Sequence, residues 1–475
     1  MLNNISTEFK RYTDHRQSTW SNNFDFKARG LGSYYHKSLA EIYKHLIPPN
    51  SSILEIGCGS GELLSSLSPS LGVGIDFSVE SIQAGHANHP NLNLHVMDAH
   101  EVSLGSQNFD FIIVSDLIND LWDVQSLLLQ IKPYCTSKTR IIFNFYNPLW
   151  SPPLTIARTL GLATPLLKQN WLTHHDMQNL LTISGYEDLR HWQEILLPLP
   201  IPILANICNR YVARIFPFSE FDLTNFMVAR LQPTPRKTKP TVSVVIAARN
   251  EAGHILELLE RVPQMGGGTE IIFVEGNSTD KTYEVIEESI KNRKDCKLIK
   301  QSGKGKGDAV RAGFNASTGD ILMILDADIT VPPEDLPRFY DLLFSGAAEF
   351  VNGVRLVYPM ESDAMRPLNF LGNKFFSWAF SWLLGQPIRD TLCGTKVLWK
   401  KDYERIADNR SYFGDFDPFG DFDLLFGAAR LNLKILEIPI RYRARRYGET
   451  NISRWSHGWL LLKMVFFAAK RIKFV

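Results

Sequence analysis

Two aspartates separated by one alanine, Asp326 and Asp328, follow an apolar run that begins at Ile321. The apolar run predicts a strand that is buried on both faces of a parallel sheet. The two carboxylates at its end repel each other unless a cation lies between them. Because a divalent metal ion can bridge carboxylates and a diphosphate, this pair predicts a metal site for a diphosphate ligand.

The segment before this strand is suited to an anion. Residues 304–320, KGKGDAVRAGFNASTGD, combine a basic, glycine-rich loop with a helix, whose first N–H groups are free to bind a phosphate. Two strand–turn–helix units precede it, starting at Thr241 and Thr269. In the second unit Glu275 ends the strand, and Ser278 to Asp280 are expected to cap the next helix.

This ordered set of motifs resembles the family 2 glycosyltransferases with the GT-A fold, across residues 241–475. Asp326-Ala327-Asp328 matches the DxD signature of that family. The stretches ILDADITVPPEDLPRFY and RDTLCGTKVL are most similar to the dolichyl-phosphate mannose and glucose synthases, and RARRYGETNI matches the basic loop of that branch with changes. The resemblance implies an inverting transfer of sugar from a nucleotide-diphosphate sugar, with Mg²⁺ or Mn²⁺.

The resemblance also implies residues that bind the nucleotide sugar. Ala247, Arg249 and Glu251 are expected at the nucleotide, and Glu275 where the family has an aspartate that contacts the base. The usual DDGSxD is EGNSTD here, which leaves the base, uracil or guanine, open.

Acids and cations are expected around the diphosphate. Asp326 is expected to contact ribose or metal, and Asp328 the metal and the diphosphate. Lys306, Arg443 and Arg446 are expected to contact phosphate, with a solvated surface charge as the alternative for each.

A second acidic segment, FGDFDPFGDFDLLFGAARL, contains Asp421 and Asp423. A sugar hydroxyl acceptor needs a general base, which either aspartate could provide. A polyprenyl phosphate acceptor is already anionic and needs no base, so the same acids would position metal or acceptor. Acids also suit a helix N-terminus, which gives a purely structural alternative.

The N-terminal half has its own ligand-binding pattern. SSILEIGCGSGELLSSL predicts a strand, a glycine turn with Gly57, Gly59 and Gly61, and a helix from Glu62. Glycines let the backbone approach a ligand closely. Asp76 ends the following strand, where an acid can accept hydrogen bonds from ribose hydroxyls.

With MDAHE and FDFIIVSDLI, this pattern resembles the class I S-adenosylmethionine-dependent methyltransferases over most of residues 30–232. The resemblance implies S-adenosyl-L-methionine as cofactor. It places Glu55, Gly57 and Gly59 at the methionine part and Asp76 at the ribose, with Asp98 and Ala99 flanking the adenine.

The methyl acceptor is less defined. Asp116, Asn119 and Asp120 follow the fourth strand, where the family usually binds its acceptor. His174 and His175 could serve as a general base. Thr173 to Asp176 also forms a capping-box pattern, which favours surface histidines in the first turn of a helix.

Two α/β domains must position these residues, a Rossmann-like methyltransferase sheet and then a GT-A sheet. A chain of 475 residues exceeds one typical core. We expect domains at 1–232 and 241–475, joined by an extended proline-rich linker at 233–240. The net charge of +1 does not favour nucleic-acid binding, and five scattered cysteines without a CxxC pair favour a reducing compartment.

The localisation predicted is cytoplasmic, with peripheral attachment to the cytoplasmic membrane face as an option. No signal peptide and no membrane-spanning run is visible. Residues 369–390 and 456–475 combine apolar, aromatic and basic residues, which favours either interfacial helices or packing against the sheet. The apolar insert 197–216 predicts a lid, a surface for the other domain, or a membrane contact.

The sequence therefore predicts a bifunctional enzyme. In this prediction, the second domain transfers a sugar to a polyprenyl phosphate, and the methyltransferase domain acts on a related glycan or lipid intermediate. The alternative is transfer to a sugar hydroxyl of a glycan, with a cofactor-binding docking module that has no methyl transfer. The sugar, the methyl acceptor and the oligomeric state stay open.

Overall fold

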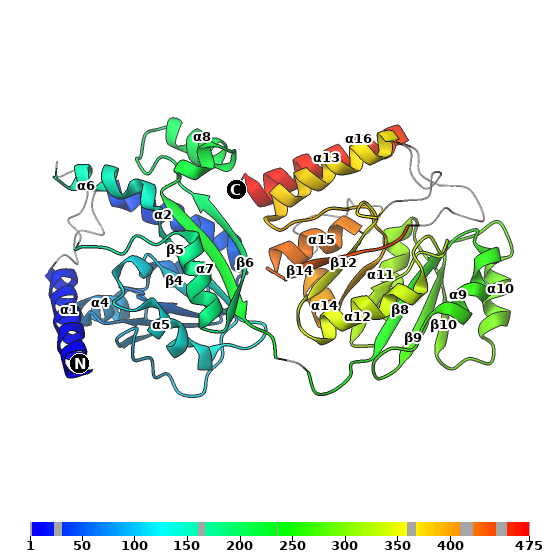
Figure 1. Cartoon of the computed structure of the whole chain (residues 1–475), viewed down its shortest axis with the longest axis horizontal. Helices are drawn as coiled ribbons and strands as arrows, with labels where there is room; N and C mark the ends of the chain where they lie inside the picture. Colours follow the sequence, from blue (N-terminus) through cyan, green and yellow to red (C-terminus); the bar gives the residue numbers. More distant parts are fainter. Residues whose placement is uncertain are drawn as a thin grey trace. The chain divides into compact units, whose positions relative to one another are not determined.

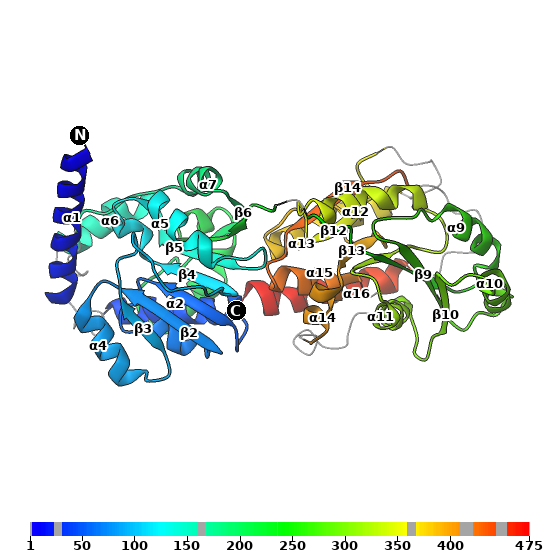
Figure 2. The ribbon, with the colours of Figure 1, turned by 90° about the horizontal axis from the view of Figure 1, so that it is seen from below.

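The computed structural model describes residues 2–22, 31–159, 167–234, 236–358, 367–408, 421–442 and 454–474. They divide into two compact units, Met1–Gln232 with Phe474–Val475, and Pro233–Lys473. Each unit contains one seven-stranded sheet with helices packed on it (Figures 1 and 2). The prediction of two α/β domains is confirmed.

The sheet of the first unit has the spatial order β3-β2-β1-β4-β5-β7-β6. Its strands are β1 (Ser52–Ile56), β2 (Leu71–Asp76), β3 (Asn93–Val96), β4 (Phe111–Ser115), β5 (Arg140–Tyr146), β6 (Tyr186–Glu194) and β7 (Thr224–Leu231). β7 runs antiparallel to β5 and β6, and the other pairs are parallel. The strand order reverses between β1 and β4, and open α/β sheets bind ligands at the carboxyl ends of such a pair.

Both faces of this sheet are buried, as alternating side chains show. Ile53 of β1 packs with α2, whereas Leu54 packs with α5 and α7 on the opposite face. This explains why the strands are nearly continuous apolar runs. The α-helices of the unit are α1 (Leu2–Asn22), α2 (Leu31–Leu46), α3 (Glu62–Ser66), α4 (Val79–Asn88), α5 (Val124–Ile131), α6 (Ser151–Thr159), α7 (His174–Ile183) and α8 (Leu204–Arg210).

The sheet of the second unit has the order β10-β9-β8-β11-β13-β12-β14. Its strands are β8 (Val242–Ala248), β9 (Thr269–Glu275), β10 (Cys296–Lys300), β11 (Ile321–Ile324), β12 (Phe350–Val354), β13 (Lys396–Trp399) and β14 (Ile435–Pro439). β13 runs antiparallel to both β11 and β12, and the other pairs are parallel. The amino-terminal end of β13 therefore lies at the edge where β11 and β12 end.

The second unit also contains α-helices. They are α9 (Ile255–Arg261), α10 (Thr282–Ile290), α11 (Lys306–Ala316), α12 (Leu336–Phe344), α13 (Pro367–Leu384), α14 (Lys400–Asp408), α15 (Asp421–Arg430) and α16 (Arg454–Ala468). Helix α11 packs on β8 and β9 through Gly313, where a β-carbon would come within 2.3 Å of Val245. This close packing fixes the start of α11 beside the end of β11.

Candidate active sites

The glycine turn of the first unit is tied to the acid that ends β2. Gly57 and Gly59 have φ angles of 74° and 55°, which favour glycine. The backbone N–H of Gly59 donates to Asp76 at 2.8 Å, and the backbone N–H of Ser78 donates to the other oxygen of Asp76 at 2.9 Å. Asp76 therefore holds the glycine turn in place, at the end of β2 where the sequence predicts it.

The remaining predicted cofactor residues lie at the same edge of the sheet. Glu55 is buried in β1 and accepts a hydrogen bond from the backbone N–H of Leu64 at 3.1 Å, which anchors α3. Gly61 immediately precedes α3. Asp98 follows β3, and Ala99 beside it is buried.

Asp98 is oriented by its neighbour His100. Its carboxylate lies 2.8 Å from His100 Nδ1 and accepts the backbone N–H of His100 at 2.8 Å. Since His100 Nε2 accepts the backbone N–H of Asp123, Nδ1 carries the proton and donates to Asp98. Burial opposes ionisation, but these His100 hydrogen bonds outweigh it and hold the pKa of Asp98 below its ordinary value.

A polar network fills the carboxyl end of β4. Asp116 has a φ of 54°, a strained conformation for a residue with a side chain. Its carboxylate accepts the Tyr35 hydroxyl at 2.8 Å and the Asn144 amide at 2.6 Å. Burial and the charge of Asp116 raise the pKa of Tyr35 well above its ordinary value, so this phenol stays protonated and donates. These contacts fix Asp116 at the place where the sequence predicts the methyl acceptor.

Asn119 and Asp120 have structural partners. Asn119 is fully buried, donates to Asn170 O at 2.7 Å and accepts from Tyr146 N at 3.0 Å. Asp120 forms an ion pair with Arg16 of α1. The fold therefore explains the buried amide of Asn119 without any role in binding the methyl acceptor.

Helix α1 lies across the ends of three strands. Gln17 donates to Phe77 O at 2.9 Å, directly after Asp76. The ring of Phe9 lies edge-on to His100, with centroids 5.1 Å apart. With the Arg16–Asp120 pair, these contacts place α1 beside α4 and over the edge that holds the predicted cofactor residues (Figures 1 and 2).

The capping box at Thr173 is confirmed. The Thr173 side chain accepts from Asp176 N, and Asp176 accepts from Thr173 N at 2.8 Å. His174 and His175 occupy the first turn of α7, and His174 stacks on His191 with centroids 4.7 Å apart. The pKa of His174 is lowered by burial and by the two neighbouring histidines.

In the second unit the turns after β8 and β9 are joined by side chains. Glu275, which is buried, accepts the backbone N–H of Ser278 at 2.6 Å. The predicted cap of α10 is confirmed for Asp280, which accepts the backbone N–H of Thr282, the first residue of the helix, at 3.0 Å, although the residue directly before the helix makes no side-chain cap bond. Ser278 instead accepts from Asn250 N at 3.0 Å, and Asp280 accepts from Ala252 N at 3.4 Å. These bonds hold the two turns together.

The predicted nucleotide residues occupy this pair of turns. Ala247 lies near the end of β8 and is half-buried, and Arg249 is exposed. Glu251 is buried and lies 2.9 Å from His254 Nδ1, and its backbone N–H donates to the Thr282 hydroxyl at 2.9 Å.

Asp326 and Asp328 stand directly after β11 and differ in charge environment. Lys306 Nζ, at the start of α11, lies 2.5 Å from Asp326 Oδ1. Burial raises the pKa of Asp326, but Lys306, with Lys396 and Arg355, outweighs burial and brings the pKa below its ordinary value. For Asp328, burial and then the charge of Asp326 raise the pKa. Lys306 thus neutralises the charge of Asp326, whereas the charge of Asp328 is compensated less well.

The backbone around Asp328 is strained and closely held. Ile329 has a φ of 53°, which a β-branched side chain rarely adopts. The Thr330 hydroxyl and backbone N–H donate to Asp328 Oδ1 at 2.8 Å and 3.2 Å. Such strain persists only where surrounding contacts enforce it, and it is concentrated at functional sites.

The segment before β13 closes one side of this acid pair. A β-carbon at Gly394 would lie 2.0 Å from Asp326 Oδ2 and 2.5 Å from Lys306 Nζ. Any larger residue there would therefore displace Asp326 or Lys306. The sequence RDTLCGTKVL contains Gly394, but nothing in the spacing reveals that this residue contacts Asp326.

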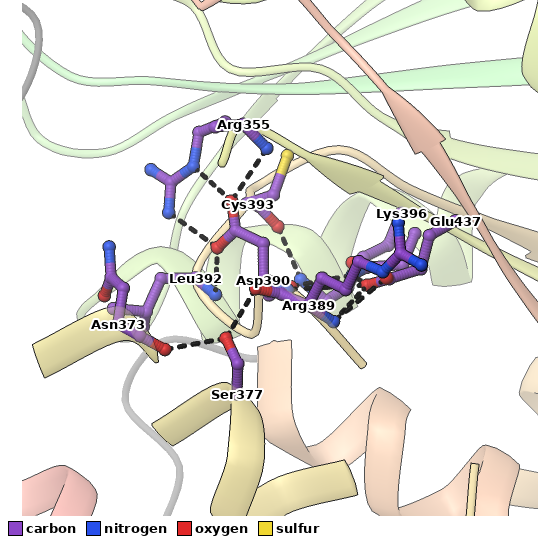
Figure 3. Close-up of polar contacts among 10 residues, drawn as sticks. Arg355, Asn373, Ser377, Arg389, Asp390, Leu392, Cys393, Lys396 and Glu437 are labelled. Atoms are coloured by element: carbon purple, nitrogen blue, oxygen red, sulfur yellow. Dashed lines mark hydrogen bonds and ion pairs between the residues drawn. The ribbon is translucent and has the colours of Figure 1, made fainter. Parts of the chain in front are cut away.

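A buried ion pair supports the same segment (Figure 3). Arg355, just after β12, donates from Nε and Nη2 to the two oxygens of Asp390 at 2.7 Å and 2.8 Å. The fully buried Asp390 also accepts the backbone N–H of Leu392 at 3.1 Å. Burial raises the pKa of Asp390, but Arg355 outweighs it and lowers the pKa below its ordinary value. Sequence reasoning missed both residues.

Glu437 and Lys396 complete this support. Glu437 of β14 accepts the backbone N–H of Arg389 at 2.9 Å and the Asn352 amide at 3.0 Å. Lys396 is fully buried at the start of β13, and its Nζ donates to Cys393 O at 2.5 Å. Figure 3 shows these groups gathered around residues 389–396. The backbone that presents Gly394 to Asp326 is thus held by charged side chains from three strands and their ends.

Four predicted residues fall in the last part of the chain. Asp423 is buried in α15. Asp421 is the first residue of α15, and its side chain is outside the described residues. Arg443 and Arg446 also lie outside the described residues.

The acid pair fits a divalent ion only as a partial ligand set. Among the described residues, no group of three or more His, Cys, Asp or Glu side chains could hold a metal ion. Two carboxylates completed by phosphate oxygens are, however, the usual surroundings of Mg²⁺ in transferases that use phosphate substrates. In the first unit, the glycine turn and the carboxylates of Asp76 and Asp98 fit a nucleoside cofactor.

Comparisons with known proteins agree with both sheets. The family model for glycosyl transferase family 2 matches residues 243–411, and a methyltransferase domain model matches residues 30–191. A dolichyl-phosphate hexose transferase of Haloferax volcanii is 30% identical over 229 residues, which are 47% of this chain and 92% of the relative. The low-salt glycan biosynthesis hexosyltransferase Agl6 of the same organism is 30% identical over 224 residues, 46% of this chain and 52% of that protein.

A solved structure adds a distant likeness. Glucosyl-3-phosphoglycerate synthase from Mycobacterium tuberculosis is 20% identical with a TM-score of 0.37, covering 49% of this chain and 80% of that one. The chain spans about half the length of Agl6 but nearly all of the hexose transferase.

The two sheets and the two matched segments define a two-domain α/β transferase. The chain belongs to glycosyl transferase family 2 through its second unit, and its first unit contains a methyltransferase domain. The resemblance of each half is confirmed, and the chain is an enzyme that contains a glycosyltransferase domain and a methyltransferase domain.

Proposed function

We propose that the second unit transfers a sugar, with inversion, from a nucleotide-diphosphate sugar to a polyprenyl phosphate. The observation that carries this proposal is the group of Lys306, Asp326 and Asp328 beside the bare backbone of Gly394. It offers carboxylates for a divalent ion and an ammonium for a phosphate at one edge of the sheet. The similarity to a dolichyl-phosphate hexose transferase supports a lipid phosphate as acceptor.

Each group has a role in this reaction. Asp326 and Asp328 would hold Mg²⁺ or Mn²⁺, which when bound neutralises the charge of the departing nucleoside diphosphate. Lys306 binds the diphosphate as a point charge. Ala247, Arg249, Glu251 and Glu275 surround the nucleoside.

The acceptor side draws on the last part of the chain. Arg443 and Arg446 bind the acceptor phosphate, and Asp421 and Asp423 position acceptor or metal. A phosphate oxygen is already anionic at neutral pH, so attack on the sugar needs no general base.

For the first unit we infer S-adenosyl-L-methionine as cofactor, with a glycan or lipid related to the transferase product as methyl acceptor. Gly57, Gly59 and Gly61 let the backbone approach the cofactor, Glu55 supports this turn, and Asp76 binds the ribose. Asp98 and Ala99 flank the adenine. Because the sulfonium already carries a good leaving group, the enzyme mainly aligns the acceptor near Asp116.

Two helices suit attachment to a membrane surface. In α16 and the turn after it, the exposed positions Trp459, Lys463, Phe466 and Lys470 follow helical spacing on one face. α13, which packs on α16, exposes Trp378. Alternating aromatic and basic side chains suit the interface of an anionic bilayer. No helix in the part of the chain described has the length and apolar content to cross a membrane.

The test of sugar transfer is release of nucleoside diphosphate from a panel of UDP- and GDP-sugars with Mn²⁺ or Mg²⁺. Each donor is offered with polyprenyl phosphate, with glycan acceptors, and without acceptor. We expect release that depends on polyprenyl phosphate and on the metal. Release that depends on a glycan would instead favour the hydroxyl acceptor and a basic role for Asp423.

The test of the first unit is calorimetric binding of S-adenosyl-L-methionine. We expect Asp76→Asn to weaken binding by about tenfold or more, because one charged hydrogen-bond acceptor is lost. Asp110→Asn, at the opposite end of the sheet before β4, is the control. Equal binding by all three proteins would remove the ribose assignment.

A further inference from the structure

Lys306 and a divalent metal ion require the same carboxylate oxygen. We propose that Lys306 holds Asp326 until a metal ion arrives and then passes to the diphosphate of the donor, so that metal and nucleotide bind cooperatively. This inference rests on the proposed function of the acid pair. It adds to that function that Lys306 exchanges Asp326 for the diphosphate as its partner.

The surroundings of Asp326 determine which of its two carboxylate oxygens a metal ion can reach. Oδ2 faces Gly394, where even a β-carbon would come within 2.0 Å. Oδ1 is held by Lys306 Nζ at 2.5 Å. The backbone at Gly394 also covers the ammonium, since the same β-carbon would lie 2.5 Å from Lys306 Nζ. A metal ion that binds Asp326 must therefore approach the oxygen that the lysine occupies.

An ammonium and a divalent ion cannot share that oxygen without strong repulsion, because both are cations at contact distance. The metal ion has one advantage, which is that it can bridge to Asp328. That carboxylate accepts hydrogen bonds from Thr330 and lies beside Asp326, whose charge opposes its ionisation. Without another anion for Lys306, however, metal binding leaves the displaced ammonium of Lys306 beside the two positive charges of the metal ion.

A nucleoside diphosphate provides that anion. Lys306 is the first residue of α11, an eleven-residue helix whose first N–H groups also favour a phosphate. Once the lysine contacts the diphosphate, Asp326 is available to the metal ion, and the metal ion in turn attracts the diphosphate. Each ligand then raises the affinity for the other by the same factor.

The first experiment measures Mn²⁺ binding alone, by calorimetry or by the electron paramagnetic resonance of free Mn²⁺, on the full chain. We expect Lys306→Met to bind Mn²⁺ about tenfold or more tightly than the wild type, within the usual range of coupling between ligands. Lys304→Met is the matched control, because this exposed lysine belongs to the same loop. Unchanged or weaker Mn²⁺ binding by Lys306→Met would overturn the inference.

The second experiment repeats the titration with saturating UDP or GDP. The wild type should bind Mn²⁺ about tenfold or more tightly with the matching nucleotide than without it, and Lys306→Met should lose most of that gain. Lys306→Arg keeps the cation and should keep part of the coupling. An equal gain in Lys306→Met and wild type contradicts the exchange of partners.

Thermal melting of each variant identifies a folding defect, and Lys306→Arg supports or refutes the coupling if Lys306→Met does not fold. If the wild type binds Mn²⁺ neither alone nor with UDP or GDP, the metal-dependent function fails together with this inference. If the wild type binds Mn²⁺ and Asp328→Asn does not, but Lys306→Met behaves as wild type, the inference alone fails.

Discussion

Gly394 lies against Asp326 so closely that a single added carbon would fall 2.0 Å from a carboxylate oxygen. The two residues are brought together by the antiparallel pairing of β13 with β11, in which Met323 is opposite Val397. The acid pair is therefore shaped as much by the backbone of residues 389–395 as by its own strand.

Replacing Gly394 by alanine should displace Asp326 or Lys306. Because misplacement of reacting groups by about 1 Å can cost on the order of 100-fold in rate, we expect sugar transfer to fall by about 10- to 100-fold. Initial rates with saturating donor measure the effect. Gly372→Ala is the control, since a β-carbon there meets nothing within 4 Å. Similar rates for both variants would show that the close contact has no part in catalysis.

Asp328→Asn should abolish metal-dependent sugar transfer, because it removes one of two carboxylates available to the metal ion. Binding of S-adenosyl-L-methionine to the first unit should be unchanged, and calorimetry on the same preparation measures this. The exposed Asp341, on α12, provides the control variant Asp341→Asn. Full transfer activity in Asp328→Asn is the result that refutes a metal role.

The Arg355–Asp390 pair should show strong coupling in a double-mutant cycle. Removing one partner leaves a buried charge unpaired, which typically costs about 3–5 kcal/mol of unfolding free energy. We expect Arg355→Met and Asp390→Leu each to be strongly destabilising and the double variant to lose less than the sum. Urea unfolding of the second unit measures this. Additive losses would mean that the two side chains act independently.

Helix α1 should slow the exchange of the methyl donor, since it lies across the ends of β2, β3 and β4. Arg16→Met breaks its ion pair with Asp120. We expect faster dissociation of S-adenosyl-L-methionine and faster hydrogen exchange along α1. Lys10→Met, an exposed position on the same helix, is the control. Identical dissociation rates in all three proteins would argue against a cover.

Exposed aromatic residues on α16 should bind anionic vesicles. Trp459 and Phe466 are 61% and 73% exposed, and Lys463 Nζ lies 5.8 Å from the Trp459 ring centroid. Replacing both aromatic residues by serine should reduce co-sedimentation with phosphatidylglycerol vesicles. Leu256→Ser removes an equally exposed apolar residue, 60% exposed on α9, and should have no effect. Deleting residues 457–475 should abolish retention if the protein still folds.

The sequence alone was sufficient to locate the residues that end strands. An apolar run followed by an acid locates Asp76, Asp326 and Asp328, because the carboxyl ends of parallel strands meet at one edge. The capping box at Thr173 was also readable, since its contacts are local. The cap predicted for α10 was right for Asp280, which accepts from Thr282 N, but the sequence did not show that Ser278 and Asp280 also bond to the neighbouring turn after β8.

What the sequence did not reveal depends on long-range pairing. Asp390 and Arg355 are 35 positions apart, and Gly394 and Asp326 are further apart still. Periodicity gives the type of an element but not the partner or register of a strand. A lysine at the start of a strand, Lys396, is expected to be exposed, and only the assembled sheet explains its burial.

The reversed direction of β13 has an evolutionary consequence. A strand that runs backwards begins where its neighbours finish, so Gly394 stays beside Asp326 however long the connection from β12 becomes. The pairing of β13 with β11, rather than the length of that connection, sets the distance between the two. Changes of length in the part of this connection that lies away from the Arg355–Asp390 pair are therefore the ones that would disturb the acid pair least.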